Sequence, residues 1–179
     1  LVSNLMTEPG GGAVNVSFAL KKLGFEVTAV TGKPEAHEFL SRVGANEILS
    51  REALDDKSGR PMLKSVYEGV VDTVGGNILA TALKSLNYGG AAAICGLVAS
   101  PDLPTSVLPF ILRGNSLFGI DSAECPMALR KQIWQKLATD YKPVDLELLV
   151  TEITLEEVPE KLDLMLKGGA MGKYLVRLA

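Results

Sequence analysis

The stretch Pro9-Gly10-Gly11-Gly12-Ala13 begins an apolar helical pattern over residues 14–23, and an apolar strand pattern follows over residues 25–30. Glycines allow a tight turn and the close approach of a ligand, and a helix N-terminus carries partial positive charge. Gly10, Gly11 and Gly12 are therefore predicted to cradle the pyrophosphate of a dinucleotide. The alternative is a glycine-rich helix start without a ligand, because the first glycine of the G-x-G-x-x-G/A pattern falls at Glu8.

The bulk properties of the chain restrict its class. It has 179 residues, a formal net charge of −3 and both signs of charge mixed along its length, which argues against a nucleic-acid-binding surface. Cys95 and Cys125 have no Cys/His cluster around them, so we expect neither a disulfide framework nor a metal site, and a reducing, cytoplasmic location is favoured. Mean hydropathy is +0.22, yet no apolar run is long enough to span a bilayer and no secretion signal is visible, so no membrane partner is expected.

Strand and helix patterns alternate from the glycine stretch to Asp140. Such alternation with short links predicts an α/β fold, a doubly wound parallel sheet of the Rossmann type with strand order 3-2-1-4-5-6. Leu129, Ile133, Trp134 and Leu137 are predicted to form the buried face of its last helix. The predicted strands cover residues 2–6, 25–30, 47–49, 69–74, 91–95 and 116–120, and the main predicted helices cover 14–23, 34–43, 77–86 and 126–138.

The pattern of predicted strands and helices changes after Asp140. A short strand at 152–154, a helix at 155–167 and a strand at 173–178 form a C-terminal strand-helix-strand tail. We therefore expect a dinucleotide-binding domain over residues 1–140 and a tail over residues 141–179.

The tip of the second strand distinguishes between cofactors. An NAD site usually has an Asp or Glu there, which accepts a hydrogen bond from the ribose 2′-hydroxyl. This tip instead reads Thr31-Gly32-Lys33, and Arg51 follows the third strand as a second cation. The residues favour NADP, meaning NADPH as the reduced cofactor, over NAD. The alternative is that Lys33 is an ordinary solvated lysine.

No side chain is predicted to be catalytic, because a nicotinamide cofactor supplies the hydride-transfer chemistry itself. His37 is the single histidine and is expected at the surface. Asp72, near the end of a buried strand, is expected to bond a backbone turn rather than to act as a base. The Cys95 thiol is expected to fill space in the core.

The order of short motifs along the chain resembles the medium-chain dehydrogenase/reductase superfamily. The most similar branch is the zinc-free quinone-oxidoreductase-like one, the YhdH/YhfP group that includes acryloyl-CoA reductases. The motifs that carry the resemblance are residues 22–25, 29–33, 37–40, 43–45, 71–75, 87–90, 95–97, 108–114 and 119–122.

The resemblance implies a function and a partner. It implies that Cys95, Gly96 and Leu97 border the nicotinamide ribose, that Thr31, Gly32 and Lys33 hold the 2′-phosphate end, and that the chain forms a homodimer through strand 116–120. It also implies a GroES-like catalytic domain that precedes this region and to which the tail returns, so this chain would be an incomplete enzyme. The alternative is a non-catalytic nucleotide-binding or structural dimerisation module.

Overall fold

The computed structural model describes residues 3–7, 20–21, 23–142 and 146–178. Its main feature is a six-stranded sheet in which all neighbours are parallel and the order is β3-β2-β1-β4-β5-β6, as the sequence predicts. The predicted Rossmann-type α/β fold is thereby confirmed. The strands are β1 (Ser3–Thr7), β2 (Glu26–Thr31), β3 (Glu47–Ser50), β4 (Tyr67–Asp72), β5 (Leu86–Ile94) and β6 (Ser116–Gly119).

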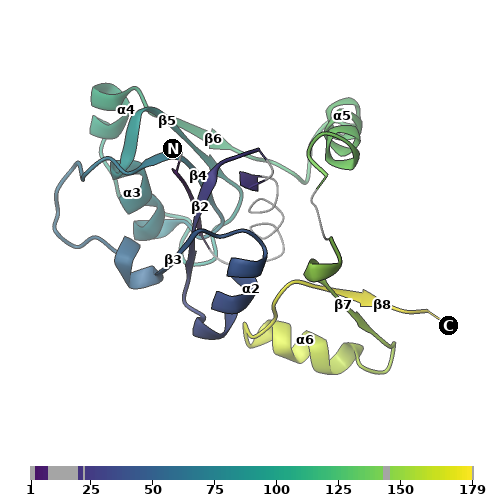
Figure 1. The fold of residues 1–179 in the computed structure, drawn as a ribbon. Helices are drawn as coiled ribbons and strands as arrows, with labels where there is room; N and C mark the ends of the chain where they lie inside the picture. Colours follow the sequence, from purple (N-terminus) through teal and green to yellow (C-terminus); the bar gives the residue numbers. More distant parts are fainter. Residues whose placement is uncertain (1–2, 8–19, 22, 143–145, 179) are drawn as a thin grey trace.

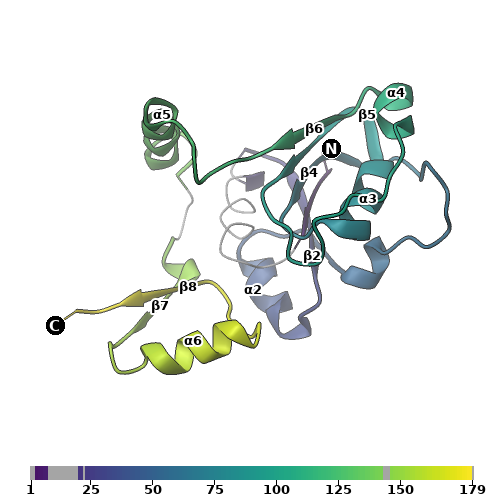
Figure 2. The same ribbon diagram turned by 180° about the vertical axis from the view of Figure 1, so that it is seen from behind.

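The sheet is covered on both faces because successive side chains of a strand point to opposite sides. In β2, Val30 belongs to a core cluster with Leu83 of α3 (Gly76–Lys84), whereas Ala29 belongs to a cluster with Leu40 of α2 (His37–Arg42). Figures 1 and 2 show α3 and α4 (Leu108–Arg113) on one face of the sheet and α2 on the other.

Arg113, the last residue of α4, forms hydrogen bonds near the N-terminal ends of β4 and β5. Its guanidinium donates to the carbonyl oxygens of Leu63, Lys84 and Leu86 at 2.5, 2.8 and 2.8 Å. These acceptors come from the loop before β4, the end of α3 and the start of β5. One half-buried cation thus ties three segments together.

The C-terminal residues form a separate unit of β7 (Val150–Ile153), α6 (Val158–Leu166) and β8 (Lys173–Val176). The strands β7 and β8 pair in parallel in their own two-stranded sheet. Leu149 and Met171 pack with Leu40 of α2, so this unit lies beside α2 (Figure 1). The strand-helix-strand tail is as predicted, while the domain boundary at residue 140 stays a prediction.

One helix departs from its predicted packing. In α5 (Met127–Ala138), the side chains of Leu129, Ile133 and Trp134 are 49, 44 and 65% exposed, and Leu137 is only partly buried. The predicted buried face is therefore wrong. Helical spacing identifies an apolar face but does not say what covers it, and α5 follows the edge strand β6 away from the sheet (Figure 1).

Within the described ranges, the structure has no helix of sufficient length and apolarity to cross a membrane.

Candidate nucleotide-binding site

The predicted site residues gather at one edge of the sheet, where the parallel strands end. Thr31 is the last residue of β2, with Gly32 and Lys33 after it, and Arg51 begins the short 3-10 helix η2 (Arg51–Leu54) directly after β3. Ligands of doubly wound sheets bind at this edge. The other predicted residues here, which follow β5, are Cys95, Gly96 and Leu97. Gly10, Gly11 and Gly12 lie outside the described residues.

The Arg51 side chain lies at the corner formed by the ends of β2 and β3. Thr31 pairs with Ser50, which puts Gly32 next to Arg51. A Cβ atom added at Gly32 would lie 3.1 Å from Nε of Arg51 and 3.3 Å from its Cδ and Cζ. The Arg51 side chain therefore lies against the bare backbone of Gly32, and a larger residue there would displace it.

Local hydrogen bonds fix the backbone of this corner. The side chain of Thr31 is buried, and its hydroxyl accepts from the backbone N–H of Lys33 at 3.0 Å. The Lys33 ammonium donates to the carbonyl oxygen of Ala170 at 3.3 Å, so it is held by the C-terminal unit rather than extending freely into solvent. An ammonium group has three donors, and this bond uses one of them.

A crevice of about 370 Å³ lies beside Arg51, between the ends of β3, β4 and β5. Its other walls come from the start of α3 and from the loop after β5. The residues that line it are Arg51, Glu52, Asp55, Gly75, Gly76, Asn77, Ile78, Ala99 and Ser100. The sequence predicted Arg51 as a site residue here, but it gave no sign of Asn77 or Ser100 as lining residues.

Asp72 organises the turn that shapes this crevice. Its side chain is fully buried, and one carboxylate oxygen accepts from the backbone N–H groups of Val74 at 3.1 Å and Gly75 at 2.7 Å. The prediction that Asp72 bonds a turn is confirmed. Close approach across the turn also requires Gly96, because a Cβ atom there would collide with the carbonyl oxygen of Thr73.

Cys95 differs from its prediction as a core residue, because it is exposed at the end of β5. Its thiol donates to the backbone carbonyl of Asp72 at 3.6 Å. Partial burial, with a smaller contribution from the Asp72 charge, raises the pKa of Cys95 above its ordinary value. A thiol that stays protonated is a poor nucleophile, so this position does not favour covalent chemistry. Leu97 is also exposed at this edge.

The remaining titratable groups of the described residues do not assemble a reaction centre here. His37 is exposed at the start of α2, as predicted. No group of three His, Cys, Asp or Glu side chains that could hold a metal ion occurs in the part of the chain that the structure describes. Fold and crevice together define a Rossmann-type nucleotide-binding domain.

Comparison with protein families identifies the class further. The family model described as "Zinc-binding dehydrogenase" matches residues 12–139. The acrylyl-CoA reductase AcuI of Ruegeria pomeroyi is 39% identical over 173 residues, which make up 96% of this chain and 52% of AcuI. YhfP of Bacillus subtilis is 40% identical over 178 residues, 98% of this chain and 54% of that protein. The chain thus spans about half the length of the curated relatives it matches.

Solved structures similar to this chain come from the same group of oxidoreductases. Escherichia coli K-12 YhdH, solved with bound NADPH, has a TM-score of 0.91 at 37% identity, and the match covers 99% of this chain and 55% of YhdH. Bacillus subtilis YhfP, solved with NAD bound, has a TM-score of 0.93 at 40% identity, covering 99% of this chain and 54% of YhfP. The chain belongs to the zinc-binding dehydrogenase family, in the quinone-oxidoreductase-like branch of the medium-chain dehydrogenase/reductase superfamily.

Proposed function

We propose that this chain binds NADP(H) as the nucleotide-binding domain of a zinc-free oxidoreductase similar to the quinone oxidoreductases and acrylyl-CoA reductases. The observation that carries the proposal is the corner where Arg51 lies against Gly32 and Lys33 follows directly. No carboxylate occupies the tip of β2 at residues 31–33 to accept from a ribose 2′-hydroxyl or to repel a 2′-phosphate.

In this proposal Lys33 and Arg51 bind the 2′-phosphate of the adenosine. A phosphate group carries between one and two negative charges at neutral pH, and a hydrogen bond to a charged group contributes about 1.5–3 kcal/mol. The planar guanidinium of Arg51 can donate two parallel bonds to phosphate oxygens, while Lys33 acts as a point charge. Thr31 supports the corner through its bond to the Lys33 backbone.

The other cofactor contacts follow the same edge. We assign the pyrophosphate to Gly10, Gly11 and Gly12, and the nicotinamide ribose to Cys95, Gly96 and Leu97. The close approach of Gly96 to the backbone of Thr73 supports this assignment, because it brings the ends of β4 and β5 together at this edge.

The reaction of the whole protein would be hydride transfer from NADPH to an enone, a quinone or an acryloyl-type thioester. No catalytic side chain of this chain is needed, because the cofactor supplies the hydride and the protein orients it. Substrate contacts would come from a GroES-like domain, and residues 141–179 would form the segment that returns to it from a nucleotide-binding domain of residues 1–140. The free thiols of Cys95 and Cys125 support a reducing, cytoplasmic location.

A second candidate function is a dimerisation module, with or without bound nucleotide. The observation that favours it is the edge position of β6, where Phe118 is 55% exposed and the following Ile120 is 50% exposed. An apolar edge strand without lysines is prone to pair with another chain. We therefore propose that two copies join through residues 116–120 about a two-fold axis.

Titration of thermal stability with NADPH and with NADH tests the proposal. A ligand at one hundred times its Kd adds about 2.7 kcal/mol of stability. We expect NADPH to raise the melting temperature at a lower concentration than NADH, and Lys33→Ala or Arg51→Ala to reduce this difference. Absence of a shift with either nucleotide at millimolar concentration would eliminate cofactor binding and leave the dimerisation module.

A further inference from the structure

Three polar side chains of α3 hold the segment that follows η2. Asn77, Thr81 and Lys84 are spaced by four and three residues, which places them along one side of the helix. The Asn77 amide donates to the Asp55 carboxylate at 2.7 Å and to the Asp56 carbonyl at 2.9 Å. The Thr81 hydroxyl accepts from the Asp56 backbone N–H at 3.1 Å, and the Lys84 ammonium bonds the Asp56 carboxylate at 2.6 Å. We refer to Asn77, Thr81 and Lys84 as the α3 clamp.

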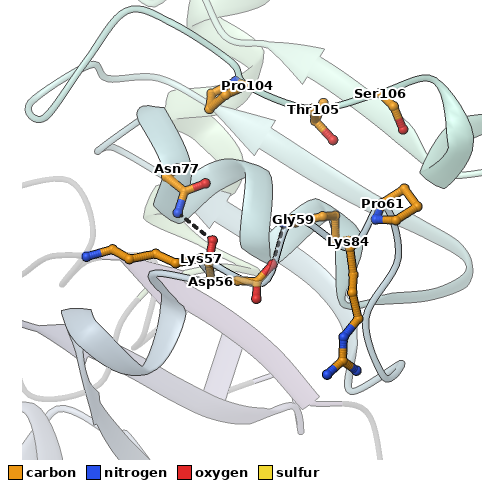
Figure 3. Close-up of a pocket in the computed structure, with 10 residues that line it drawn as sticks. Asp56, Lys57, Gly59, Pro61, Asn77, Lys84, Pro104, Thr105 and Ser106 are labelled. Atoms are coloured by element: carbon orange, nitrogen blue, oxygen red, sulfur yellow. Dashed lines mark hydrogen bonds and ion pairs between the residues drawn. The ribbon is translucent and has the colours of Figure 1, made fainter.

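Figure 3 shows Asn77 and Lys84 at the wall of a second cavity, of about 520 Å³, with Asp56 between them. Asn77 lines both this cavity and the crevice beside Arg51. Asn77 therefore forms part of the wall between the two spaces. A displacement of the clamped residues would change the shape of the crevice.

The charges within the clamp are compensated. The side chains of Lys84 and Asp56 are only 8 and 14% exposed, and the hydrogen bond from Lys84 lowers the pKa of Asp56 to about 2. In the crevice wall, Asp55 is paired with Lys57 at 3.0 Å, and its pKa is lowered first by the Asn77 amide and then by Lys57. Asp55 and Asp56 thus each bond a cation of their own, whereas Glu52, the other carboxylate that lines the crevice, bonds the Ser50 side chain.

The clamped residues end a segment that is fixed along its length. Its start is set by the pairing of Ser50 with Thr31, and its middle by Leu54, which is 3% exposed in the core. Its end is set by the bonds to Asp55 and Asp56. Arg51 lies within this segment, so its backbone position depends on all three restraints.

We propose that the α3 clamp positions Arg51 for the 2′-phosphate and thereby sets the preference for NADPH over NADH. The inference rests on the proposed function, in which Arg51 contacts that phosphate. Asn77, Thr81 and Lys84 act here as positioning residues, because none of them is required to touch the nucleotide. The physical reason is that a bidentate bond tolerates displacement of only a few tenths of an ångström before one of its two hydrogen bonds is lost.

Calorimetric Kd values for NADPH and NADH test the inference. For Asn77→Ala we expect the Kd of NADPH to rise about 10-fold or more, since one charge-assisted bond to the phosphate is lost, and the Kd of NADH to change less than about 2-fold. Thr81→Val keeps the side-chain volume and removes the hydroxyl acceptor. It should also raise the ratio of the Kd of NADPH to the Kd of NADH. The matched control is Asn87→Ala, which removes an amide bond of 2.7 Å to Glu68 at the far end of β5 and should leave both Kd values unchanged.

A double-mutant cycle separates this inference from the proposed function. If the clamp acts through Arg51, the double variant Arg51→Ala/Asn77→Ala should have the same ratio of NADPH Kd to NADH Kd as Arg51→Ala alone. If Arg51→Ala raises the ratio of the Kd of NADPH to the Kd of NADH while Asn77→Ala and Thr81→Val do not, the clamp inference is wrong and the proposed function stands. If Arg51→Ala leaves the ratio unchanged, the assigned role of Arg51 is wrong and the clamp inference is overturned with it. Equal losses for NADPH and NADH in Asn77→Ala and Thr81→Val would also overturn the inference, since they indicate a general structural role.

Discussion

Removal of the Asp72 carboxylate is expected to lower the free energy of unfolding by about 3 kcal/mol. The Asp72→Ala variant leaves the backbone N–H groups of Val74 and Gly75 without the carboxylate oxygen that now accepts from both, at 3.1 and 2.7 Å. Each buried donor that loses its partner costs roughly 1–3 kcal/mol, and water has little access because Asp72 is 0% exposed. The two penalties together are a large fraction of the roughly 5–15 kcal/mol that stabilises an ordinary domain.

Urea denaturation followed by circular dichroism measures this loss. With a slope of about 2 kcal/mol per molar urea, the midpoint should fall by about 1.5 M. The matched control is Asp121→Ala, because one Asp121 carboxylate oxygen also accepts from two backbone N–H groups, of Ala123 and Glu124, both at 3.0 Å, but in an exposed loop. Water replaces that oxygen, so the control should lose less than about 1 kcal/mol. Equal midpoints for the two variants would refute the reasoning that burial makes the Asp72 turn costly to break.

Three further perturbations test other parts of the structure. Arg113→Met should lower the free energy of unfolding by about 3 kcal/mol in the same urea assay, because it leaves three carbonyl acceptors without the guanidinium; an unchanged midpoint would contradict this. Asp56 has a folded-state pKa of about 2, below its ordinary value near 4, so its contribution to stability is present above pH 4 and is lost as pH falls toward 2. Asp56→Asn should therefore lose less stability than the unchanged protein between pH 4 and pH 2. Identical losses for the two proteins would contradict a stabilising role of the Asp56 carboxylate. Phe118→Lys, at the exposed edge strand, should convert the proposed dimer to a monomer in sedimentation velocity, and a dimer that persists would place the subunit contact elsewhere.

Much of the sheet could be predicted from sequence because local signals agree with its topology. The apolar runs that became β2 and β4 are bounded by glycines, and Pro34 and Gly44 mark the region of α2. The position of Asp72 near the end of an apolar strand was sufficient to predict that it bonds a turn. These are short-range effects, in which neighbouring residues determine the conformation.

The predictions that were wrong concern contacts between residues that are far apart in the sequence. The spacing of Leu129, Ile133 and Trp134 predicts an apolar helix face, but only the three-dimensional arrangement reveals that α5 leaves the sheet. Exposure of Cys95 could not be inferred either, since apolar residues precede it in β5.

The α3 clamp lay beyond prediction for the same reason. Asn77 is 22 residues from Asp55, and Lys84 is 28 residues from Asp56. In sequence, the two acidic residues belong to an ordinary polar loop. Their bonds to one side of α3 arise only after η2 and α3 have packed together.

The central claim concerns a 2′-phosphate at the corner of Lys33 and Arg51, and adenosine 2′,5′-bisphosphate tests it without the nicotinamide. Its Kd should be compared by calorimetry with that of adenosine 5′-monophosphate, which lacks only the 2′-phosphate. We predict that the bisphosphate binds at least about 10-fold more tightly, and that Arg51→Ala removes most of this advantage. Equal Kd values for the two nucleotides would contradict the account.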